Sequence, residues 1–305
     1  MERFTLFSGT ANVNLATAIG RELRVGLGAC TVNRFPDGEV SVDIGETVHR
    51  REVFIVQPTC PPVNDHLMEL LAMADACRRA SAGKIVAVVP YFGYARSDKR
   101  HGRREPIMAS MVALVAQTVG IDHLITMDLH AAQIEGFFQN AVDILSAVPV
   151  ICSAIRDRLP PGTVVVSPDE GRVKMAAQYA QRLKTSVIVI HKHRETGSDV
   201  HALRVVGDVQ ERPCLIVDDM ISTGGTIASS VEALLRAGAR GEIFVAATHG
   251  LLLPGSCEKL NHPAIRNVFV TDTVPVERET PPGLSVITVA PLLAEAIRNI
   301  HAQAT

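Results

Sequence analysis

The stretch Cys214-Leu-Ile-Val-Asp-Asp-Met-Ile-Ser-Thr-Gly-Gly-Thr226 decides the fold. Its first four residues form a short apolar run that is typical of a buried parallel strand. Asp218 and Asp219 come where that strand is expected to end, and a helical pattern covers 227–237 after the glycines. A strand, a glycine-containing turn and a helix in this order predict one unit of an α/β fold.

The five residues before the helix predict a phosphate-binding loop. Gly224 and Gly225 let backbone N–H groups approach an anion, and the helix start adds unpaired N–H groups with a favourable dipole. Hydroxyl donors come from Ser222, Thr223 and Thr226. Two adjacent carboxylates beside a phosphate would repel it unless they meet sugar hydroxyls or a hydrated Mg²⁺, and a ribose phosphate offers such hydroxyls. A plain strand, turn and N-cap is the alternative interpretation.

Length and composition limit the classes of protein that this chain can be. Its 305 residues, 47% of them hydrophobic, are enough for two buried cores and suggest two domains. A formal net charge of −2 argues against wholesale binding of nucleic acid or of a membrane surface. The six cysteines show no CxxC pair, and neither a signal peptide nor a transmembrane span is indicated. We therefore expect a cytoplasmic protein with reduced thiols.

Apolar runs alternate with helical patterns along the whole chain. This alternation predicts an α/β fold of two domains, 1–147 and 148–305, each a mostly parallel sheet flanked by helices. The expected strands cover 4–8, 53–57, 84–90, 123–128, 163–167, 186–190, 213–217, 243–248, 267–271 and 285–289, and expected helices include 14–23, 65–80, 106–119 and 291–302.

Polar residues gather where the expected strands end, which is where open parallel sheets bind ligands. The run 96–104, with five Arg or Lys residues, follows one strand, and Asp128 and His130 follow the next. Asp169 comes after the strand 163–167, and His191-Lys-His-Arg194 comes after 186–190. The basic run suits a mobile clamp over a polyphosphate, and His130 suits a Mg²⁺ or a phosphate oxygen. A solvated turn and a structural histidine are the alternatives.

Several motifs together resemble the ribose-phosphate diphosphokinases, also called phosphoribosyl-pyrophosphate synthetases, over nearly the whole chain. Beside Val217-Asp-Asp-Met-Ile-Ser-Thr-Gly-Gly-Thr226 these are Arg34-Phe-Pro-Asp-Gly-Glu39, Pro90-Tyr-Phe-Gly-Tyr-Ala-Arg-Ser-Asp98, the long run 126–138, Ser167-Pro-Asp-Glu-Gly171 and the run 191–194. The resemblance implies two tandem domains of the type I phosphoribosyltransferase fold. It also implies that ATP, bound to Mg²⁺ as its cofactor, donates its diphosphoryl group to the anomeric hydroxyl of ribose 5-phosphate, with phosphoribosyl pyrophosphate and AMP as products.

The same resemblance assigns roles to single residues. It implies that Phe35, Asp37 and Glu39 hold the adenine of ATP bound mainly to an adjacent protomer, and that the chain forms a dimer-based homo-oligomer such as a hexamer. Arg96, Asp98 and His130 would contact ATP, and His130 and Asp169 would be linked to Mg²⁺. Ribose 5-phosphate would bind Asp218, Asp219, Ser222, Thr223, Gly224, Gly225 and Thr226. Lys192 and Arg194 would be the catalytic pair.

Some positions depart from the family pattern. Ser97 stands where many members have Gln, Ser222 where many have Asp, and Glu170-Gly-Arg172 where many have a small residue before Gly-Gly. Two alternatives therefore stay open. A phosphoribosyltransferase that consumes the sugar pyrophosphate would share the stretch 214–226, and a non-catalytic regulatory homologue would share the fold. Neither nucleic acid nor a membrane is expected as a partner.

Overall fold

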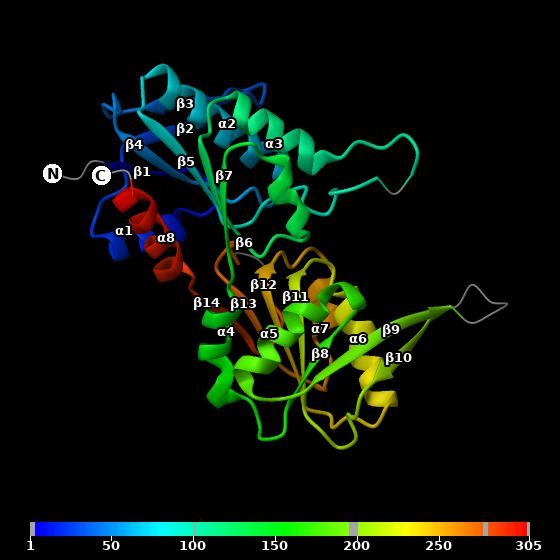
Figure 1. The fold of residues 1–305 in the computed structure, drawn as a ribbon. Helices are drawn as coiled ribbons and strands as arrows, with labels where there is room; N and C mark the ends of the chain where they lie inside the picture. Colours follow the sequence, from blue (N-terminus) through cyan, green and yellow to red (C-terminus); the bar gives the residue numbers. More distant parts are fainter. Residues whose placement is uncertain (1–3, 101, 195–200, 277–279, 304–305) are drawn as a thin grey trace. The chain divides into compact units, whose positions relative to one another are not determined.

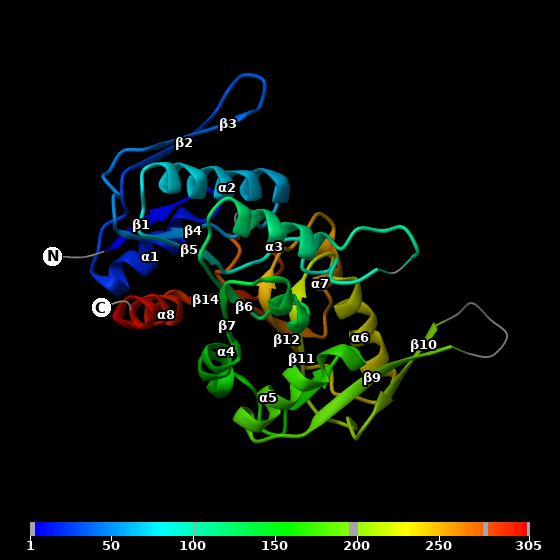
Figure 2. The same cartoon turned by 45° about the horizontal axis from the view of Figure 1, so that its top comes forward.

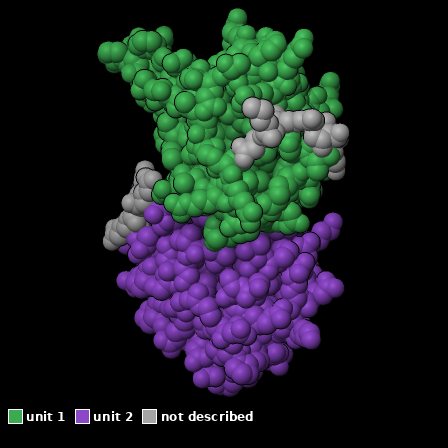
Figure 3. Space-filling model, turned by 90° about the vertical axis from the view of Figure 1, so that its left-hand side faces the viewer, with its two compact units in different colours: residues 1–145, 273–275, 288–305 green, residues 146–272, 276–287 purple. Residues whose placement is uncertain are grey.

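The computed structural model describes residues 4–100, 102–194, 201–276 and 280–303, except the side chains of 192–194, 201–202 and 303. The chain forms two compact units, coloured separately in Figure 3. Unit 1 comprises residues 1–145, 273–275 and 288–305, and unit 2 comprises 146–272 and 276–287.

Unit 1 is built on a parallel sheet with the strand order β1-β4-β5-β6-β7. The central strands of this sheet are almost wholly apolar and buried, because helices cover both faces of the sheet. Helices α2 and α3 lie on one face and α1 and α8 on the other (Figure 1). The strands are β1 (Phe4–Ser8), β4 (Glu52–Val56), β5 (Lys84–Val89), β6 (His123–Met127) and β7 (Ala141–Leu145), and the helices are α1 (Val13–Leu23), α2 (Val63–Arg79), α3 (Met108–Thr118), the 3₁₀ helix η1 (Ala132–Phe137) and α8 (Ala290–Gln303).

An antiparallel hairpin, β2 (Cys30–Arg34) and β3 (Val40–Ile44), is added to unit 1. It was not among the expected strands, although its apolar residues alternate and Pro36-Asp-Gly38 is a turn sequence. Figure 2 shows the hairpin beside α2. One set of alternate side chains, Cys30, Val32, Val42 and Ile44, packs against the core that α2 shares with the sheet.

The last helix, α8, belongs to unit 1 and not to the domain 148–305 in which the sequence placed it. His301 Nδ1 lies 2.8 Å from Glu52 Oε2, and its ring meets that of Phe4 edge-on, with 4.9 Å between the centroids. Arg298 donates to the backbone carbonyl of Glu22 at the end of α1. The C-terminal segment therefore completes one face of the first sheet.

Unit 2 has a sheet with the order β10-β9-β8-β11-β12-β13-β14, in which only the β9–β10 pairing is antiparallel among the described residues. From β8 the chain passes through α5 to β9 on one side, and from β11 it passes through α6 to β12 on the other. The order of strands thus reverses between β8 and β11. The elements are α4 (Val148–Ile155), η2 (Arg156–Arg158), β8 (Val164–Ser167), η3 (Glu170–Arg172), α5 (Val173–Leu183), β9 (Val187–Arg194), β10 (His201–Val206), β11 (Cys214–Ile221), α6 (Gly225–Arg236), β12 (Ile243–Gly250), α7 (Ser256–Leu260), β13 (Ile265–Thr271) and β14 (Leu284–Ile287).

The predicted α/β class, with mostly parallel sheets flanked by helices, is confirmed in both units. A reversal of strand order creates a crevice at the carboxyl ends of the two strands, where open α/β sheets bind their ligands. In unit 2 this point lies between β8 and β11. Within the described residues, none of the helices has the length and apolar character that crossing a membrane would need.

Candidate active site

The acid pair Asp218 and Asp219 lies on strand β11, which runs on to Ile221 instead of ending at Val217. Pairing with β8 stops at Ile216, whereas pairing with β12 continues through Asp218 to Ile221. Both residues are buried, with 9% and 2% of their surface exposed. The backbone N–H of Asp219 donates to Asp218 Oδ1 at 2.8 Å. The carboxylates therefore stand on a rigid strand at the reversal point.

The residues 222–226 form a tight turn into helix α6. Gly224 adopts a left-handed backbone with φ of +73°, and a Cβ atom there would lie 3.3 Å from the carbonyl oxygen of Ser256. The carbonyl of Ser222 accepts a hydrogen bond from Leu253 N at 3.0 Å, which fixes the start of the loop. Helix α6 begins at Gly225 with no side-chain cap. Its first N–H groups can therefore receive an anion.

A second segment reaches the acid pair from the end of β8. Asp169 caps the short helix η3, because its Oδ1 accepts from Arg172 N at 3.2 Å. The guanidinium of Arg172 then bridges the two carboxylates, with Nε 3.2 Å from Asp218 Oδ1 and Nη2 3.0 Å from Asp219 Oδ2. In the sequence, Arg172 stands out only as a departure from the family pattern. Its contact depends on β8 and β11 being neighbours, which no local signal reveals.

The pKa of Asp218 is raised to about 8, chiefly because burial disfavours the charged carboxylate. The side-chain hydrogen bond with Asp219 and the charge of that residue also raise the pKa, whereas the charge of Arg172 and the backbone N–H of Asp219 lower it. The pair therefore holds a proton more firmly than exposed carboxyl groups do, and its remaining oxygen lone pairs can accept hydrogen bonds from the hydroxyls of a ligand.

Lys192 and Arg194 lie within strand β9, paired with Leu203 and His201 of β10. The expectation that this strand ends at Ile190 is wrong, because pairing with β10 continues it to Arg194. The two side chains lie outside what the structure describes, and so do residues 195–200. The neighbouring His191 Nδ1 is 2.7 Å from Glu170 Oε1, which ties the start of this hairpin to η3.

In unit 1, a pocket of about 620 Å³ lies between the end of β5 and the start of α2. Arg96 lines it and is exposed, so its guanidinium can reach a ligand. The hydroxyl of Tyr94 donates to Asn64 Oδ1 across the pocket wall. The pocket is lined by Pro62, Val63, Asn64, Asp65, Tyr91, Tyr94, Arg96 and Ser97.

Asp98 and His130 lie elsewhere in unit 1. Asp98 is only 8% exposed, and its Oδ2 accepts from Gln133 Nε2 at 2.5 Å. His130 is half-buried just after β6. Asp169, its expected partner at Mg²⁺, belongs to unit 2. Among the described residues, no three or more His, Cys, Asp or Glu side chains cluster as a metal cage.

Phe35, Asp37 and Glu39 form the exposed tip of the β2–β3 hairpin. Phe35 has 54% of its surface exposed, so its ring is available for contact with a ligand. The tip is ordered by backbone hydrogen bonds between Phe35 and Glu39 and between Gly38 and Phe35. Asp37 Oδ1 also accepts from Glu39 N at 3.1 Å. The three expected ATP-binding side chains thus share one well-defined turn.

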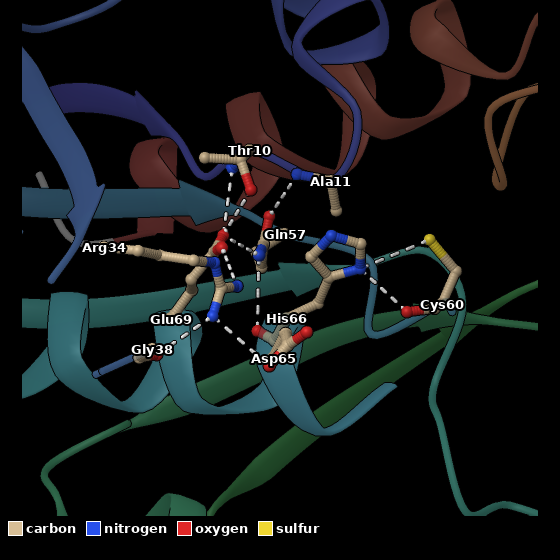
Figure 4. A network of polar contacts seen from close by, with 9 residues as sticks. All are labelled: Thr10, Ala11, Arg34, Gly38, Gln57, Cys60, Asp65, His66 and Glu69. Atoms are coloured by element: carbon tan, nitrogen blue, oxygen red, sulfur yellow. Dashed lines mark hydrogen bonds and ion pairs between the residues drawn. The ribbon is translucent and has the colours of Figure 1, made fainter. Parts of the chain in front are cut away.

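A partly buried polar network that the sequence did not reveal anchors this hairpin (Figure 4). Arg34, at the end of β2, contacts Asp65 and Glu69 of α2, each at 3.3 Å. Glu69 Oε2 accepts from Thr10 Oγ1 at 2.6 Å, from Thr10 N at 3.2 Å and from Gln57 Nε2 at 2.8 Å. The network therefore joins the hairpin to the segments that follow β1 and β4.

Two family models match the chain: the N-terminal domain of ribose phosphate pyrophosphokinase over residues 4–120, and the phosphoribosyl synthetase-associated domain over residues 196–305. The ribose-phosphate pyrophosphokinase of Rhodopirellula baltica is 46% identical over 305 residues, which cover 99% of this chain and 96% of the relative. Ribose-phosphate pyrophosphokinase A of Dictyostelium discoideum is 44% identical over 303 residues, which cover 98% and 95%.

A solved structure is similar over almost its whole length. The crystal structure of phosphoribosylpyrophosphate synthetase from Mycobacterium smegmatis superposes with a TM-score of 0.92 at 40% sequence identity. The match covers 99% of this chain and 100% of the other.

Proposed function

The chain belongs to the ribose phosphate pyrophosphokinase family, and from that premise we propose that it transfers the diphosphoryl group of Mg·ATP to ribose 5-phosphate. The anomeric hydroxyl attacks the β-phosphorus, AMP leaves, and 5-phospho-α-D-ribose 1-diphosphate forms. The observation that supports this most directly is the acid pair and phosphate loop at the strand reversal of unit 2. The product would serve nucleotide biosynthesis.

The sugar phosphate would bind along one continuous segment of chain. Its 5-phosphate would meet the N–H groups of 224–226 and the hydroxyls of Ser222, Thr223 and Thr226. The carboxylates of Asp218 and Asp219 would accept hydrogen bonds from the ring hydroxyls. Because both carboxylates are buried on a strand, they can hold the sugar in one orientation, and positioning is most of what such a transfer requires of the protein.

ATP would use elements of unit 1. Arg96 lines the pocket near the end of β5, where its guanidinium can bind phosphate oxygens. The exposed Phe35, with Asp37 and Glu39, would hold the adenine of an ATP bound mainly to a neighbouring protomer. The exposure of an ordered hairpin tip supports this arrangement, and we propose a dimer-based homo-oligomer of the cytoplasm, with a hexamer as one such form.

The carboxylate of Asp169 and the imidazole of His130 are side chains that fit a Mg²⁺ site. This cation keeps several waters and takes one or two carboxylates plus substrate phosphates, so the absence of a described protein cage is no obstacle. Asp169 would supply a carboxylate oxygen, and the imidazole of His130 suits a phosphate oxygen or a metal-bound water. A bound Mg²⁺ would offset negative charge on the transferred group. Lys192 and Arg194 would stabilise the same charge in the transition state.

The test is to incubate the protein with ribose 5-phosphate and Mg·ATP and to measure AMP. We expect AMP only when both substrates are present, and a strong loss of activity in Asp219→Asn but not in the exposed control Asp157→Asn. Consumption of the sugar pyrophosphate with a nucleobase, without ATP, would point to a phosphoribosyltransferase instead. No AMP from protein of native circular dichroism would refute the proposal.

A further inference from the structure

The guanidinium of Arg172 lies between the two carboxylates that the sugar is proposed to contact. Nε is 3.2 Å from Asp218 Oδ1 and Nη2 is 3.0 Å from Asp219 Oδ2. The three side chains are 14%, 12% and 2% exposed, so this is a largely buried fork and not a surface ion pair. Such pairs keep their geometry better than exposed ones.

The chain holds Arg172 in this place through its backbone. Strand β8 pairs with β11 in parallel as far as Val166 and Ile216, so the residues that follow β8 lie beside the acid pair. The carboxylate of Asp169 then caps η3 by accepting from Arg172 N, and Ser167 Oγ donates to the carbonyl of Asp169. The bridge is therefore built before any ligand arrives.

Two adjacent buried carboxylates repel each other and need a shared proton, a cation or hydroxyl donors. A guanidinium fork meets that need with fixed geometry, because its N–H donors are planar and directed. A carboxylate has about four lone-pair sites, so the contacts of Asp218 Oδ1 with Arg172 Nε and with the backbone N–H of Asp219 do not exhaust the acceptor capacity of that carboxylate. Arg172 and a pair of vicinal hydroxyls can thus be bound by the same two carboxylates.

We infer that Arg172 is a positioning residue for the sugar, a built-in cation that orients both carboxylates toward the vicinal hydroxyls so that ribose 5-phosphate binds without a divalent metal. This inference rests on the proposed function, because it takes the sugar hydroxyls to be the ligands of Asp218 and Asp219. It makes Arg172 a determinant of selectivity for a sugar with two vicinal hydroxyls.

Direct binding of ribose 5-phosphate, measured by calorimetry in EDTA and then in excess Mg²⁺, tests the inference. The wild type should bind in EDTA within about threefold of its affinity in Mg²⁺. Arg172→Ala should weaken binding in EDTA about 10- to 100-fold, the range expected when hydrogen bonds to charged groups are lost. Mg²⁺ should restore much of that loss. Arg172→Lys, which keeps the charge without the fork, should fall between the two.

Two controls separate positioning from general effects. Lys174→Ala removes an exposed cation close in the sequence and should leave binding unchanged. With 2-deoxyribose 5-phosphate, which lacks one hydroxyl of the pair, Arg172→Ala should cost much less than with ribose 5-phosphate. A merely structural role would weaken both sugars equally. Arg172→Lys, together with thermal melting of each variant, keeps the test valid if Arg172→Ala folds poorly.

Three outcomes would overturn the inference. Wild-type binding that requires Mg²⁺ would leave the proposed function standing and remove the role of Arg172. Equal binding by Arg172→Ala in EDTA would show that the guanidinium does not help the sugar to bind, and tighter binding would show that it obstructs the sugar. If neither the wild type nor any variant bound ribose 5-phosphate even with Mg²⁺, the proposed function itself would fail, and the inference with it.

Discussion

Replacing Glu69 by Gln should loosen the β2–β3 hairpin while leaving the rest of unit 1 folded. Glu69 Oε2 receives three hydrogen bonds, two from Thr10 and one from Gln57, whereas Oε1 receives one from Arg34. The amide oxygen of a glutamine would take the place of Oε2, because that position needs an acceptor. Its NH₂ group would then face the guanidinium of Arg34, donor against donor.

The size of the effect follows from burial and charge. Glu69 is 3% exposed at its side chain, but Arg34 is 40% exposed, so solvent screens part of the ion pair. We expect Glu69→Gln to cost about 1–3 kcal/mol, because the range of about 1.5–3 kcal/mol for a hydrogen bond to a charged group is lowered by solvent screening at Arg34. Glu69→Ala also leaves the donors of Thr10 and Gln57 without an acceptor and should cost about 3–5 kcal/mol.

Hydrogen exchange is the assay that resolves this effect, because it reports local opening. Amides of 30–44 should exchange about 5- to 150-fold faster in Glu69→Gln, which is 1–3 kcal/mol in opening free energy. Since the hairpin tip bears the proposed adenine contacts, KM for ATP should rise more than kcat falls.

The matched control is Asp75→Asn on the same helix, since Asp75 pairs with Arg78 and Arg79 at the end of α2. It should leave exchange of the hairpin unchanged. If Glu69→Gln exchanged like the wild type over 30–44 and kept the same KM for ATP, the anchoring role of this network would be refuted.

Three other predictions concern the proposed chemistry. Alanine at Lys192 or Arg194 should lower kcat about 10²-fold or more with little change in KM, as for loss of one transition-state donor, and steady-state kinetics showing a change in KM alone would contradict this role. Mixing Asp37→Ala with Arg96→Ala protein should restore part of the activity if ATP sites are shared between subunits, and no recovery after confirmed subunit exchange would count against sharing. The pKa of Asp218, about 8 when folded against an ordinary 3.8, makes the folded state bind more protons between these values. The free energy of unfolding should therefore lose this contribution as pH rises from about 4 to 8. When this free energy is measured by urea titration at a series of pH values, it should change less with pH in Asp218→Asn than in the wild type.

Local sequence patterns were enough to identify most of the parallel strands. In a buried strand such as β4, the residues after Glu52 form a continuous apolar run, and this pattern can be recognised without knowing which strands lie beside it. The hairpin β2–β3 was missed although its alternation and its Pro36-Asp-Gly38 turn were present in the sequence. Helix α8 was recognised as a helix, but its membership of unit 1 depends on contacts such as His301 with Glu52, between opposite ends of the chain.

In the candidate site, too, some residues can be predicted from local sequence and others depend on contacts between distant segments. The acid pair and the loop 222–226 are contiguous in sequence, so residue types and spacing were sufficient to predict them. The partners that hold functional residues in place, Arg172 beside Asp219 and Glu69 beside Arg34, come from distant segments. Their contacts exist only because particular strands and helices are neighbours. The family relationship that the motifs indicated is confirmed by the full-length relatives, whereas the roles of single residues stay predictions.

The continuation of β11 beyond β8 explains why the two kinds of proposed site are built differently. Had the strand ended at Val217, as the sequence predicts, both carboxylates would sit in a loop and could follow the ligand. Because β11 stays paired with β12 through Ile221, their backbone is fixed and only a partner side chain such as Arg172 can adjust their orientation. A site that must align one hydroxyl with a phosphorus gains from such rigidity.

The tip of the β2–β3 hairpin differs from the acid pair, because it is not fixed within a buried sheet. The side chains that we propose to bind ATP are exposed there, and their position depends on the anchor at Glu69. A change at this buried carboxylate should therefore affect ATP binding while the sugar site stays intact.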